Sequence, residues 1–299
     1  MEIQSVRANV NETWHTLTFN SDTGKWTATI TAPGATSFHQ PGGYYNVQIE
    51  AKNAAGTTTT EDASTLDGLK LYVKETVAPV ITIVSPTDGA YVSNSRQPVV
   101  LNATDEQGGS GVNLSSLVIK MDGTPVTGGI TSTAITNGYS ITYTPETALE
   151  DGQHTFEATI KDNDGNISTA KSTTYTIDTV PPILNVTSPT DHLITAAASL
   201  TVSGTTNDAT SSPVTVTIEL NGTDQGAVTV SSSGVFSKTV TLQEGDNIIL
   251  ITATDAANKV TSVARTVTLD SSTPEITSVS MTPNPVDAGM TMLVEVVVV

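Results

Sequence analysis

The sequence predicts an all-β chain built from tandem β-sandwiches. Thr, Val, Ser and Ile occur in short runs separated by Gly and Pro, and no long stretch has the period of a helix. A proline-flanked segment also recurs three times, beginning at Thr76, Thr179 and Ser272. Each copy has prolines, a short apolar run and a Ser-Pro or Thr-Pro stop. Because proline cannot donate to a central ladder, it belongs at strand ends, and we interpret each copy as the first strand of a domain.

The spacing of these copies predicts the size of the repeat. Pro79, Pro182 and Pro274 are 103 and 92 residues apart, which is close to one immunoglobulin-like sandwich each. We therefore expect tandem immunoglobulin-like β-sandwiches in an elongated rod, with domains at residues 1–77, 78–178, 179–271 and 272–299. The first domain is expected to lack the opening strands A and B, and residues 272–299 to supply only strands A and B of an incomplete domain.

A second repeated unit lies late in each of the three larger domains. Gly43, Gly152 and Gly245 are each followed at eight and ten residues by Ala51 and Asn53, Ile160 and Asp162, or Ala253 and Asp255. Apolar residues occupy alternate positions between these points, as expected for a strand with one buried face. The shared spacing favours repeats of one fold and says nothing about chemistry.

Composition excludes several classes of function. The formal charge of −18 disfavours a nucleic-acid partner, because affinity for phosphates comes from Lys and Arg. No apolar run approaches the roughly 20 residues that a membrane span needs, so we expect no membrane insertion. The chain has no Cys, which excludes disulfides and thiolate sites. The N-terminus lacks the apolar segment of a secretory signal peptide, as expected for a chain exported by another route or for a segment of a longer protein.

The sequence predicts no enzyme. The four histidines are scattered over three expected domains. No Ser-His-Asp arrangement, phosphate-binding glycine loop or zinc spacing is present. A role as the accessory module of a glycan-degrading enzyme would require a catalytic domain outside this sequence.

The order of several motifs carries a resemblance to a known family. Ser85-Pro86-Thr87-Asp88-Gly89 is followed by a Gly-rich loop at residues 108–112, Asp-Gly turns at 122–123 and 151–152, and Asp162-Asn163-Asp164-Gly165-Asn166. This order resembles bacterial Ig-like repeats. The whole chain is similar to Ig-like domain proteins from tailed-phage and prophage structural clusters of Gram-positive gut bacteria. The resemblance implies a virion or tail structural protein, located in the phage particle or on an extracellular surface, that contacts the host surface.

Calcium is the only cofactor that the residues suggest, and none is required by the predicted function. Asp162, Asp164 and Asn166 present alternating oxygen ligands, as at the start of a calcium loop, and Asp178 in the following linker is expected at the same end. The bidentate Glu that closes such a loop is absent. An ordinary hairpin turn explains the same residues equally well.

Aromatic residues concentrate in the first domain and suggest a glycan site. Phe38, Tyr44 and Tyr45 flank a predicted loop tip, where aromatic faces suit the sugar rings of bacterial surface glycans. The alternative is that the aromatics, Trp14, Phe19 and Trp26 above all, form the core of a domain with few other large side chains.

The C-terminal segment predicts assembly by strand complementation. An unpaired apolar strand is an aggregation hazard that natural proteins cover. We expect this segment to complete a sheet on another copy of the chain or on a different virion protein. The residues expected at that contact are Ile276, Val279, Met292, Val294, Val296 and Val298. The alternatives are that the sequence is a segment of a longer array, or that the first domain is a small self-sufficient sandwich.

These observations together predict a non-enzymatic structural protein of a phage tail or related particle. The runner-up is a bacterial cell-surface adhesin or stalk.

Overall fold

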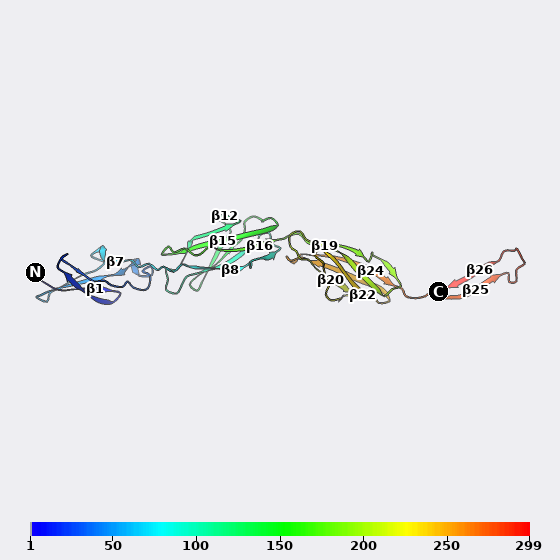
Figure 1. Cartoon of the computed structure of the whole chain (residues 1–299), viewed down its shortest axis with the longest axis horizontal. Helices are drawn as coiled ribbons and strands as arrows, with labels where there is room; N and C mark the ends of the chain where they lie inside the picture. The colour runs from blue at the N-terminus through cyan, green and yellow to red at the C-terminus, as the bar shows by residue number, and fades with distance from the viewer. Residues whose placement is uncertain (1) are drawn as a thin grey trace. The chain divides into compact units, whose positions relative to one another are not determined.

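The computed structural model describes residues 2–299 and confirms the all-β prediction (Figure 1). Within that range the helical elements are two single 3₁₀ turns, η1 (Pro41–Gly43) and η2 (Asp67–Leu69), neither of which is long or apolar enough to cross a membrane. The chain divides into a first unit that ends at Ile177 and a second that begins at Asp178. The two units are described separately.

The first unit opens with an N-terminal domain dominated by one sheet, in the order β3-β2-β1-β5-β6. Its strands are β1 (Ile3–Val10), β2 (Thr13–Asn20), β3 (Lys25–Thr27), β5 (Gln48–Asn53) and β6 (Thr58–Glu61). The only other pairing in this domain, among the residues that the structure describes, joins the two-residue strands β4 (Tyr45–Asn46) and β7 (Lys70–Leu71). The domain therefore has one full sheet where a sandwich has two.

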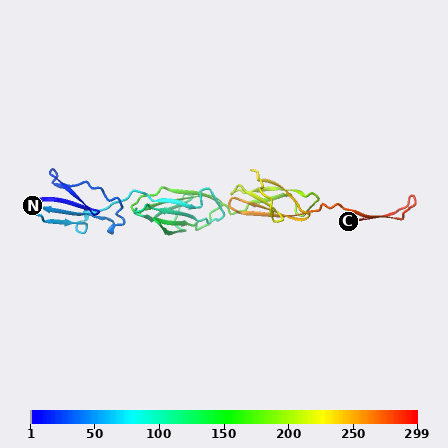
Figure 2. The same cartoon turned by 90° about the horizontal axis from the view of Figure 1, so that it is seen from below.

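A complete sandwich follows in the first unit, with two layers visible in Figure 2. One sheet has the order β13-β14-β10-β8, and the other has the order β12-β11-β15-β16-β9. The strands are β8 (Val80–Ser85), β9 (Ala90–Val92), β10 (Val99–Thr104), β11 (Val112–Met121), β12 (Thr124–Val126), β13 (Ile130–Ile135), β14 (Gly138–Tyr143), β15 (Gly152–Asp162) and β16 (Lys171–Ile177). Alternate residues of both sheets meet in one core that includes Leu101, Ile141, Phe156 and Tyr175.

The second unit contains the next sandwich, built to the same plan. Its sheets have the orders β17-β19-β22 and β21-β20-β23-β24-β18. The strands are β17 (Ile183–Ser188), β18 (Leu193–Thr195), β19 (Ser199–Asn207), β20 (Thr215–Leu220), β21 (Thr223–Asp224), β22 (Val235–Thr241), β23 (Gly245–Thr254) and β24 (Val260–Leu269). Its core is a separate cluster that includes Val202, Phe236 and Ile251.

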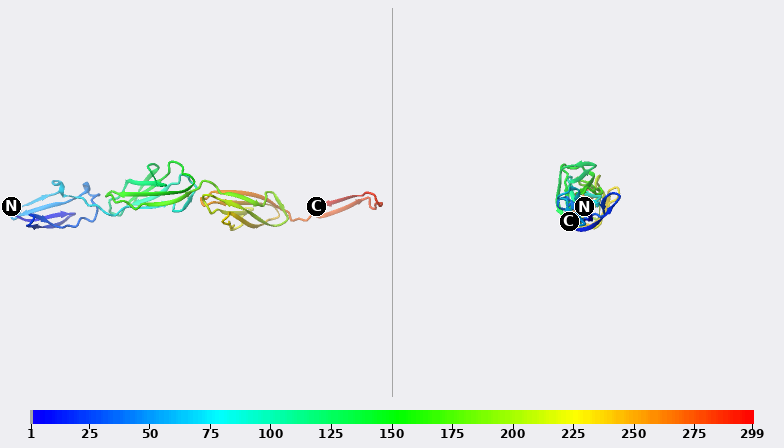
Figure 3. Two further views of the ribbon diagram at one scale, coloured as in Figure 1. Left: turned by 45° about the horizontal axis from the view of Figure 1, so that its top comes forward. Right: turned by 90° about the vertical axis from the view of Figure 1, so that its left-hand side faces the viewer.

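The second unit ends in a hairpin of β25 (Ile276–Thr282) and β26 (Leu293–Val298), drawn in red in Figure 3. Within residues 2–299 these two strands pair only with each other. The pairing of β25 with β26 repeats the pairing of β8 with β10 and of β17 with β19.

Strand order relates the N-terminal domain to the two sandwiches. The run β2-β1-β5-β6 corresponds to β12-β11-β15-β16 and to β21-β20-β23-β24, because each places the late glycine-led strand between the same two neighbours. The sheet of the N-terminal domain is therefore the equivalent of one layer of a sandwich. The described residues provide no equivalent of β8-β10-β14 in that domain.

The two separate cores predict independent responses to mutation. Phe156 is fully buried in the first core and Phe236 is almost fully buried in the second. We expect Phe156→Ala to cost about 3–5 kcal/mol of unfolding free energy, because the cavity adds to the lost transfer free energy. Differential scanning calorimetry should show the transition of the β8–β16 sandwich lowered and that of the β17–β24 sandwich unchanged. Phe236→Ala should give the reverse, and a joint shift in either variant would contradict separate cores.

His154 predicts a pH dependence of the β8–β16 sandwich. Its Nδ1 is 2.8 Å from Asp122 Oδ2 and its Nε2 is 2.8 Å from the Glu150 carbonyl oxygen, so both ring nitrogens face acceptors. Burial lowers the pKa of His154, but the hydrogen bonds to Asp122 and to the Glu150 carbonyl oxygen, with the charge of Asp122, together outweigh burial and leave the pKa above the usual 6.5. The imidazolium should therefore stabilise the fold below pH 6.5, and this contribution should be lost as the pH rises through the folded-state pKa.

The matching experiment compares wild type with Asp122→Asn by urea unfolding at pH 5.5 and pH 8.5. Asn can keep the positive φ of residue 122 and the oxygen that accepts from the Thr155 amide. We expect the substitution to cost about 1 kcal/mol more at the lower pH, because the Asp122 side chain is 47% exposed and solvent weakens a charged hydrogen bond. An equal cost at both pH values would exclude a charged His154.

Candidate metal centre

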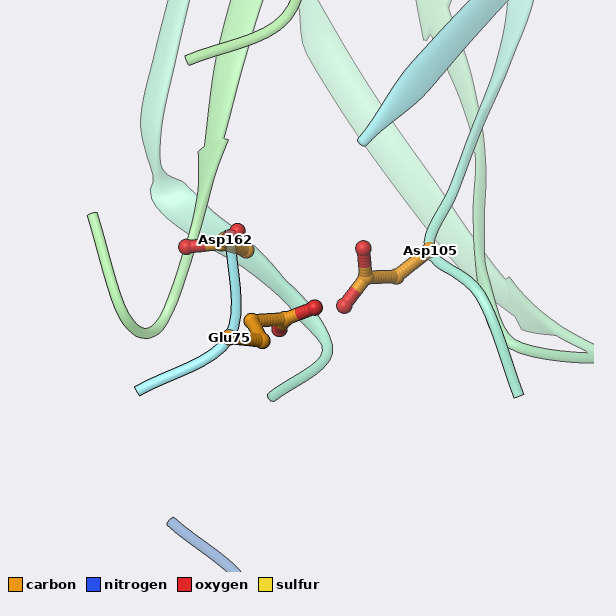
Figure 4. Close-up of side chains that lie close together, drawn as sticks. All are labelled: Glu75, Asp105 and Asp162. Carbon is orange, nitrogen blue, oxygen red and sulfur yellow. The ribbon is translucent and has the colours of Figure 1, made fainter. Parts of the chain in front are cut away.

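Three carboxylates from distant segments meet at the start of the β8–β16 sandwich. Glu75 lies in the linker before β8, Asp105 directly follows β10, and Asp162 is the last residue of β15. One carboxylate oxygen of each lies within 4.8 Å of the other two. Figure 4 shows the Glu75 and Asp105 carboxylates pointing toward each other, with Asp162 beside Glu75.

A second cluster occupies the equivalent place in the next sandwich. Asp178, Asp208 and Asp255 also bring three carboxylate oxygens within 4.8 Å of one another. Asp178 stands five residues before β17, as Glu75 stands before β8, and Asp208 directly follows β19 as Asp105 follows β10. In both clusters the linker carboxylate precedes the second carboxylate by 30 residues. The fold therefore builds the same arrangement twice.

Loop amides hold the first cluster in place. Asp162 Oδ1 accepts from the Gly165 and Asn166 amides at 2.6 and 2.9 Å, and Oδ2 accepts from Asn166 Nδ2 at 2.7 Å. Asp105 Oδ2 accepts from the Gly111 amide at 2.7 Å, and Glu75 Oε1 accepts from the Ser110 amide. These bonds fix each carboxylate and leave one oxygen of Glu75 and one of Asp105 uncommitted.

When Glu106, next to Asp105, is ionised, three buried carboxylate oxygens have no hydrogen-bond donor among residues 2–299. They are Glu75 Oε2 and Asp105 Oδ1 in the first cluster and Asp255 Oδ2 in the second. Asp105 is only 7% exposed and Asp255 only 5%. No Lys, Arg or His of that range forms an ion pair with any of the six cluster residues. A buried carboxylate oxygen without a partner is costly and calls for an explanation such as a bound ion.

Like charges in the first cluster also alter proton affinity. Burial, with the charges of Glu75 and Asp162 nearby, raises the pKa of Asp105. Next to it, a hydrogen bond with Glu75 raises the pKa of Glu106 to about 7. The cluster of the next sandwich has Ala209 at the position of Glu106. There, burial raises the pKa of Asp208, but amide hydrogen bonds from Ser211 and Thr210 outweigh it and lower the pKa overall.

The first cluster adjoins contacts between the N-terminal domain and the sandwich. Asp164 Oδ2 accepts from Thr36 Oγ1 at 2.5 Å and from the Glu75 amide at 3.0 Å. His39 Nε2 is 2.8 Å from the carbonyl oxygen of Gly109, four residues from Asp105. Glu75 thus joins the cluster through its side chain and the interdomain contact through its amide.

The residues predicted to bind calcium separate in the structure. Asp162 lies in the first cluster, but Asp164 turns toward Thr36 and Asn166 bonds to Asp162. Asp178 belongs to the second cluster, because it lies in the linker before β17 and not beside the turn after β15. The four residues therefore do not form a single loop site. In the turn after β15, Asp164 accepts a hydrogen bond from Thr36, whereas Asn166 donates one to Asp162.

The predicted glycan-binding aromatics have different environments. Phe38 is 46% exposed and stacks edge-on against His39, and Tyr44 contacts the exposed Tyr72. Tyr45 is buried at 6% exposure, and its hydroxyl donates to the Ala35 carbonyl oxygen. The structure removes Tyr45 from the glycan-binding candidates, because its ring is not accessible to a sugar.

The alternative prediction was that Trp14, Phe19 and Trp26 form the core of the N-terminal domain, and the exposure of two of these rings contradicts it in part. Trp14 and Phe19 are 38% and 51% exposed. Arg7 covers the Trp14 ring, and Phe19 stacks on Trp26 beside a hollow of about 410 Å³. The single sheet of the N-terminal domain is too small to enclose these rings.

Five of the six predicted assembly residues share one face of the terminal hairpin. Val279 pairs with Val296, and Ile276 pairs with Val298; Val294 pairs with Met281. Directly paired residues of an antiparallel ladder point to the same side, and alternate residues of β26 share that side. Met281, opposite Val294, also lies on this face. Met292 lies one residue before β26, outside the paired ladder, and its place at the contact stays a prediction.

Sequence reasoning did not assign Glu75, Asp105 and Asp208 as metal ligands, and it placed Asp255 at the position equivalent to Asp162 without assigning a repeated site there. The sequence does contain a pattern that marks the linker residues of the two clusters. A carboxylate precedes the repeated proline by four residues in all three copies, as Glu75, Asp178 and Asp270. The other members could not be recognised without knowing which loops share an end of the sandwich.

The chemistry available to these clusters is that of a hard cation site. All the converging donors are carboxylate oxygens, which suit Ca²⁺ and Mg²⁺ rather than transition metals.

Two family models match separate parts of the chain. Residues 87–179 match a bacterial Ig-like domain, and residues 182–271 match domain B of glucodextranase. A comparison with curated proteins gave no match.

Solved structures with similar tandem modules share little sequence with the chain. Fibronectin(III)-like modules of Clostridium thermocellum CbhA are 16% identical, with a TM-score of 0.43, over 64% of this chain and 94% of that one. A titin I-band fragment is 12% identical, with a TM-score of 0.42, over 89% of this chain and 87% of that one. Bacteroides ovatus SGBP-B, solved with a mixed-linkage heptasaccharide, is 16% identical, with a TM-score of 0.24, over 95% of this chain and 65% of that one.

The prediction of tandem Ig-like sandwiches is confirmed. The fold is typical of non-enzymatic modules and is consistent with a structural or cell-surface protein.

Proposed function

We propose that this chain is a non-enzymatic structural protein of a phage tail or related particle, whose Ig-like modules assemble by strand complementation. The observation that carries the proposal is the apolar face of the β25–β26 hairpin. Its six residues are 44–63% exposed, and no other described strand pairs with the hairpin. An uncovered apolar two-stranded sheet is marginally stable alone and tends to join another sheet.

The N-terminal domain offers a suitable acceptor in a second copy. Its sheet corresponds to one layer of a sandwich, whereas β25–β26 corresponds to two strands of the opposite layer. Val6 pairs with Leu17, and alternation places Phe19 and its partner Trp26 on the same side of the sheet as Val6. Ile3, Phe19 and Trp26 line the hollow on that sheet. The hairpin of one copy would cover these side chains in the next, giving a head-to-tail contact.

Paired substitutions on the two faces of the hairpin test the assembly. Val294→Asp with Val296→Asp places two charges on the apolar face, whereas Val297→Asp places one on the opposite face, where Val297 is equally exposed and pairs with Ser278. We expect the double variant to weaken self-association at least about 100-fold, since burying an unpaired carboxylate costs several kcal/mol. The Val297 variant should associate like wild type in sedimentation velocity runs over a range of concentrations.

A further variant tests the acceptor surface. Phe19→Asp should weaken association as the hairpin double variant does. Normal association of the Phe19 variant would mean that the hairpin binds a different protein or a different surface. A wild-type chain that stays monomeric at all concentrations would refute assembly between copies.

The particle itself is proposed from the resemblance of the sequence motifs to phage structural proteins. The runner-up is a bacterial cell-surface adhesin or stalk, to which the confirmed fold is equally suited. In either setting Phe38 is the exposed aromatic among those predicted to contact bacterial surface glycans, with Tyr44 half-buried beside the exposed Tyr72. Immunogold electron microscopy with antibodies against residues 87–271 should label purified phage particles. Labelling confined to cell surfaces would favour the runner-up.

A further inference from the structure

We propose that Glu75, Asp105 and Asp162 form one Ca²⁺ site and that Asp178, Asp208 and Asp255 form an equivalent second site, one at the start of each complete sandwich. This inference does not depend on the proposed assembly. It concerns what stabilises the end of each module where the linker enters.

The first argument is the pair of buried oxygens that lack partners. Asp105 Oδ1 and Asp255 Oδ2 belong to residues more than nine-tenths buried, and each is in a carboxylate triad. Amide donors satisfy the other oxygen of each residue, at Gly111 for Asp105 and at Lys259 for Asp255. Each carboxylate is thus fixed with one oxygen left for a cation. Each triad thus contains a buried, unpartnered carboxylate oxygen, on the residue after β10 in the first and on the residue after β23 in the second, and each such oxygen calls for a partner.

The second argument is the repetition of the sequence positions. Three equivalent positions are acidic in both sandwiches. They are the linker residue (Glu75 and Asp178), the residue after β10 or β19 (Asp105 and Asp208), and the residue at the end of β15 or β23 (Asp162 and Asp255). A buried serine also bonds to the linker carboxylate in both, through the Ser110 amide to Glu75 and the Ser211 hydroxyl to Asp178. The loops that carry the two serines otherwise differ in length and sequence. What is repeated is the set of oxygen donors.

The number and kind of the ligands favour calcium over magnesium. Each triad brings three carboxylate oxygens within 4.8 Å of one another, close enough for one cation to contact all three. Ca²⁺ takes several protein carboxylates, whereas Mg²⁺ usually keeps several waters and binds through one or two carboxylates. Water and nearby backbone oxygens would complete the six to eight ligands that Ca²⁺ takes.

Binding at the first site would also hold the N-terminal domain. The Glu75 amide donates to Asp164, which accepts from Thr36, and Asn166 Nδ2 donates both to Asp162 and to the Glu75 carbonyl oxygen. A cation bound to Glu75 and Asp162 would fix the linker between these contacts. The same ion that neutralises the cluster would therefore limit motion of the linker.

The test is isothermal titration of the full chain with Ca²⁺ after chelator treatment, together with thermal unfolding in calcium and in chelator. Wild type should bind two Ca²⁺ ions, and calcium should raise the unfolding temperature of each sandwich by about 10 °C at saturation. Asp105→Asn and Asp208→Asn should each remove one ion, lowering affinity at the altered site at least about 100-fold. Asp224→Asn, at an exposed turn outside both clusters, is the matched control and should bind two.

Thermal unfolding in chelator checks that the variants still fold. In chelator each Asp→Asn change relieves repulsion between like charges, so it should leave the unfolding temperature of its sandwich unchanged or raise it. Cleavage by trypsin at Lys74, next to Glu75, should slow in calcium for wild type and Asp208→Asn but not for Asp105→Asn.

Several outcomes would overturn the proposal. These are an absence of heat with Ca²⁺, identical melting in calcium and chelator, or two ions still bound by the Asp105→Asn/Asp208→Asn double variant. Equal affinity for Mg²⁺ would overturn the choice of calcium.

Discussion

An apolar sheet face must be covered, and the architecture of this chain depends on that constraint. In the β8–β16 and β17–β24 sandwiches each sheet covers the other, and residues such as Phe156 and Phe236 are almost completely buried. Neither core cluster found in residues 2–299 includes a residue before Ile81. The N-terminal sheet buries Val6, Ala8 and Val10 but leaves Phe19 half exposed. The proposed assembly follows from this difference between the covered sheets of the two sandwiches and the partly uncovered sheet of the N-terminal domain.

The ends of the sandwiches obey a second constraint, set by charge. Where β10, β15, β19 and β23 stop, the chain places carboxylates whose backbone neighbours turn their amides inward. Buried like charges repel one another, and this cost rises as water is excluded. The raised pKa of Asp105 reflects that burial. A cation removes the cost and turns three repelling groups into ligands, so the cost and the proposed site have the same physical origin.

Much of the fold was predictable because it rests on local signals. Proline-flanked runs identified β8, β17 and β25, and the glycine-led spacing gave the strands that begin at Gly152 and Gly245. In the N-terminal domain the same spacing was less exact, since η1 contains Gly43 and the long strand begins only at Gln48. The aromatics there were assigned to a core that one sheet cannot enclose.

The candidate site was predictable only in part, because it depends on contacts between distant loops. Asp162, Asp164 and Asn166 look like one loop in sequence, yet the turn directs Asp164 to Thr36, 128 residues away. Asp105 and Asp208 give no local signal, since a single acid after a strand is ordinary. The register of the terminal hairpin is also set by pairing between two strands: Met281 lies opposite Val294, and Met292 lies one residue before β26.

The two constraints meet at Glu75. The N-terminal domain has the smaller buried core in the first unit, and small cores contribute less to stability, so its contacts with the β8–β16 sandwich matter to its order. Those contacts run through Asp164, Thr36, His39 and the Glu75 amide. The Glu75 side chain belongs to the triad, so the charge state of the triad acts on the same residue that anchors the domain. The domain with the partly open sheet is therefore joined to the sandwich through a residue whose side chain belongs to the carboxylate triad, so the proposed cation would act on the same contact that holds this domain.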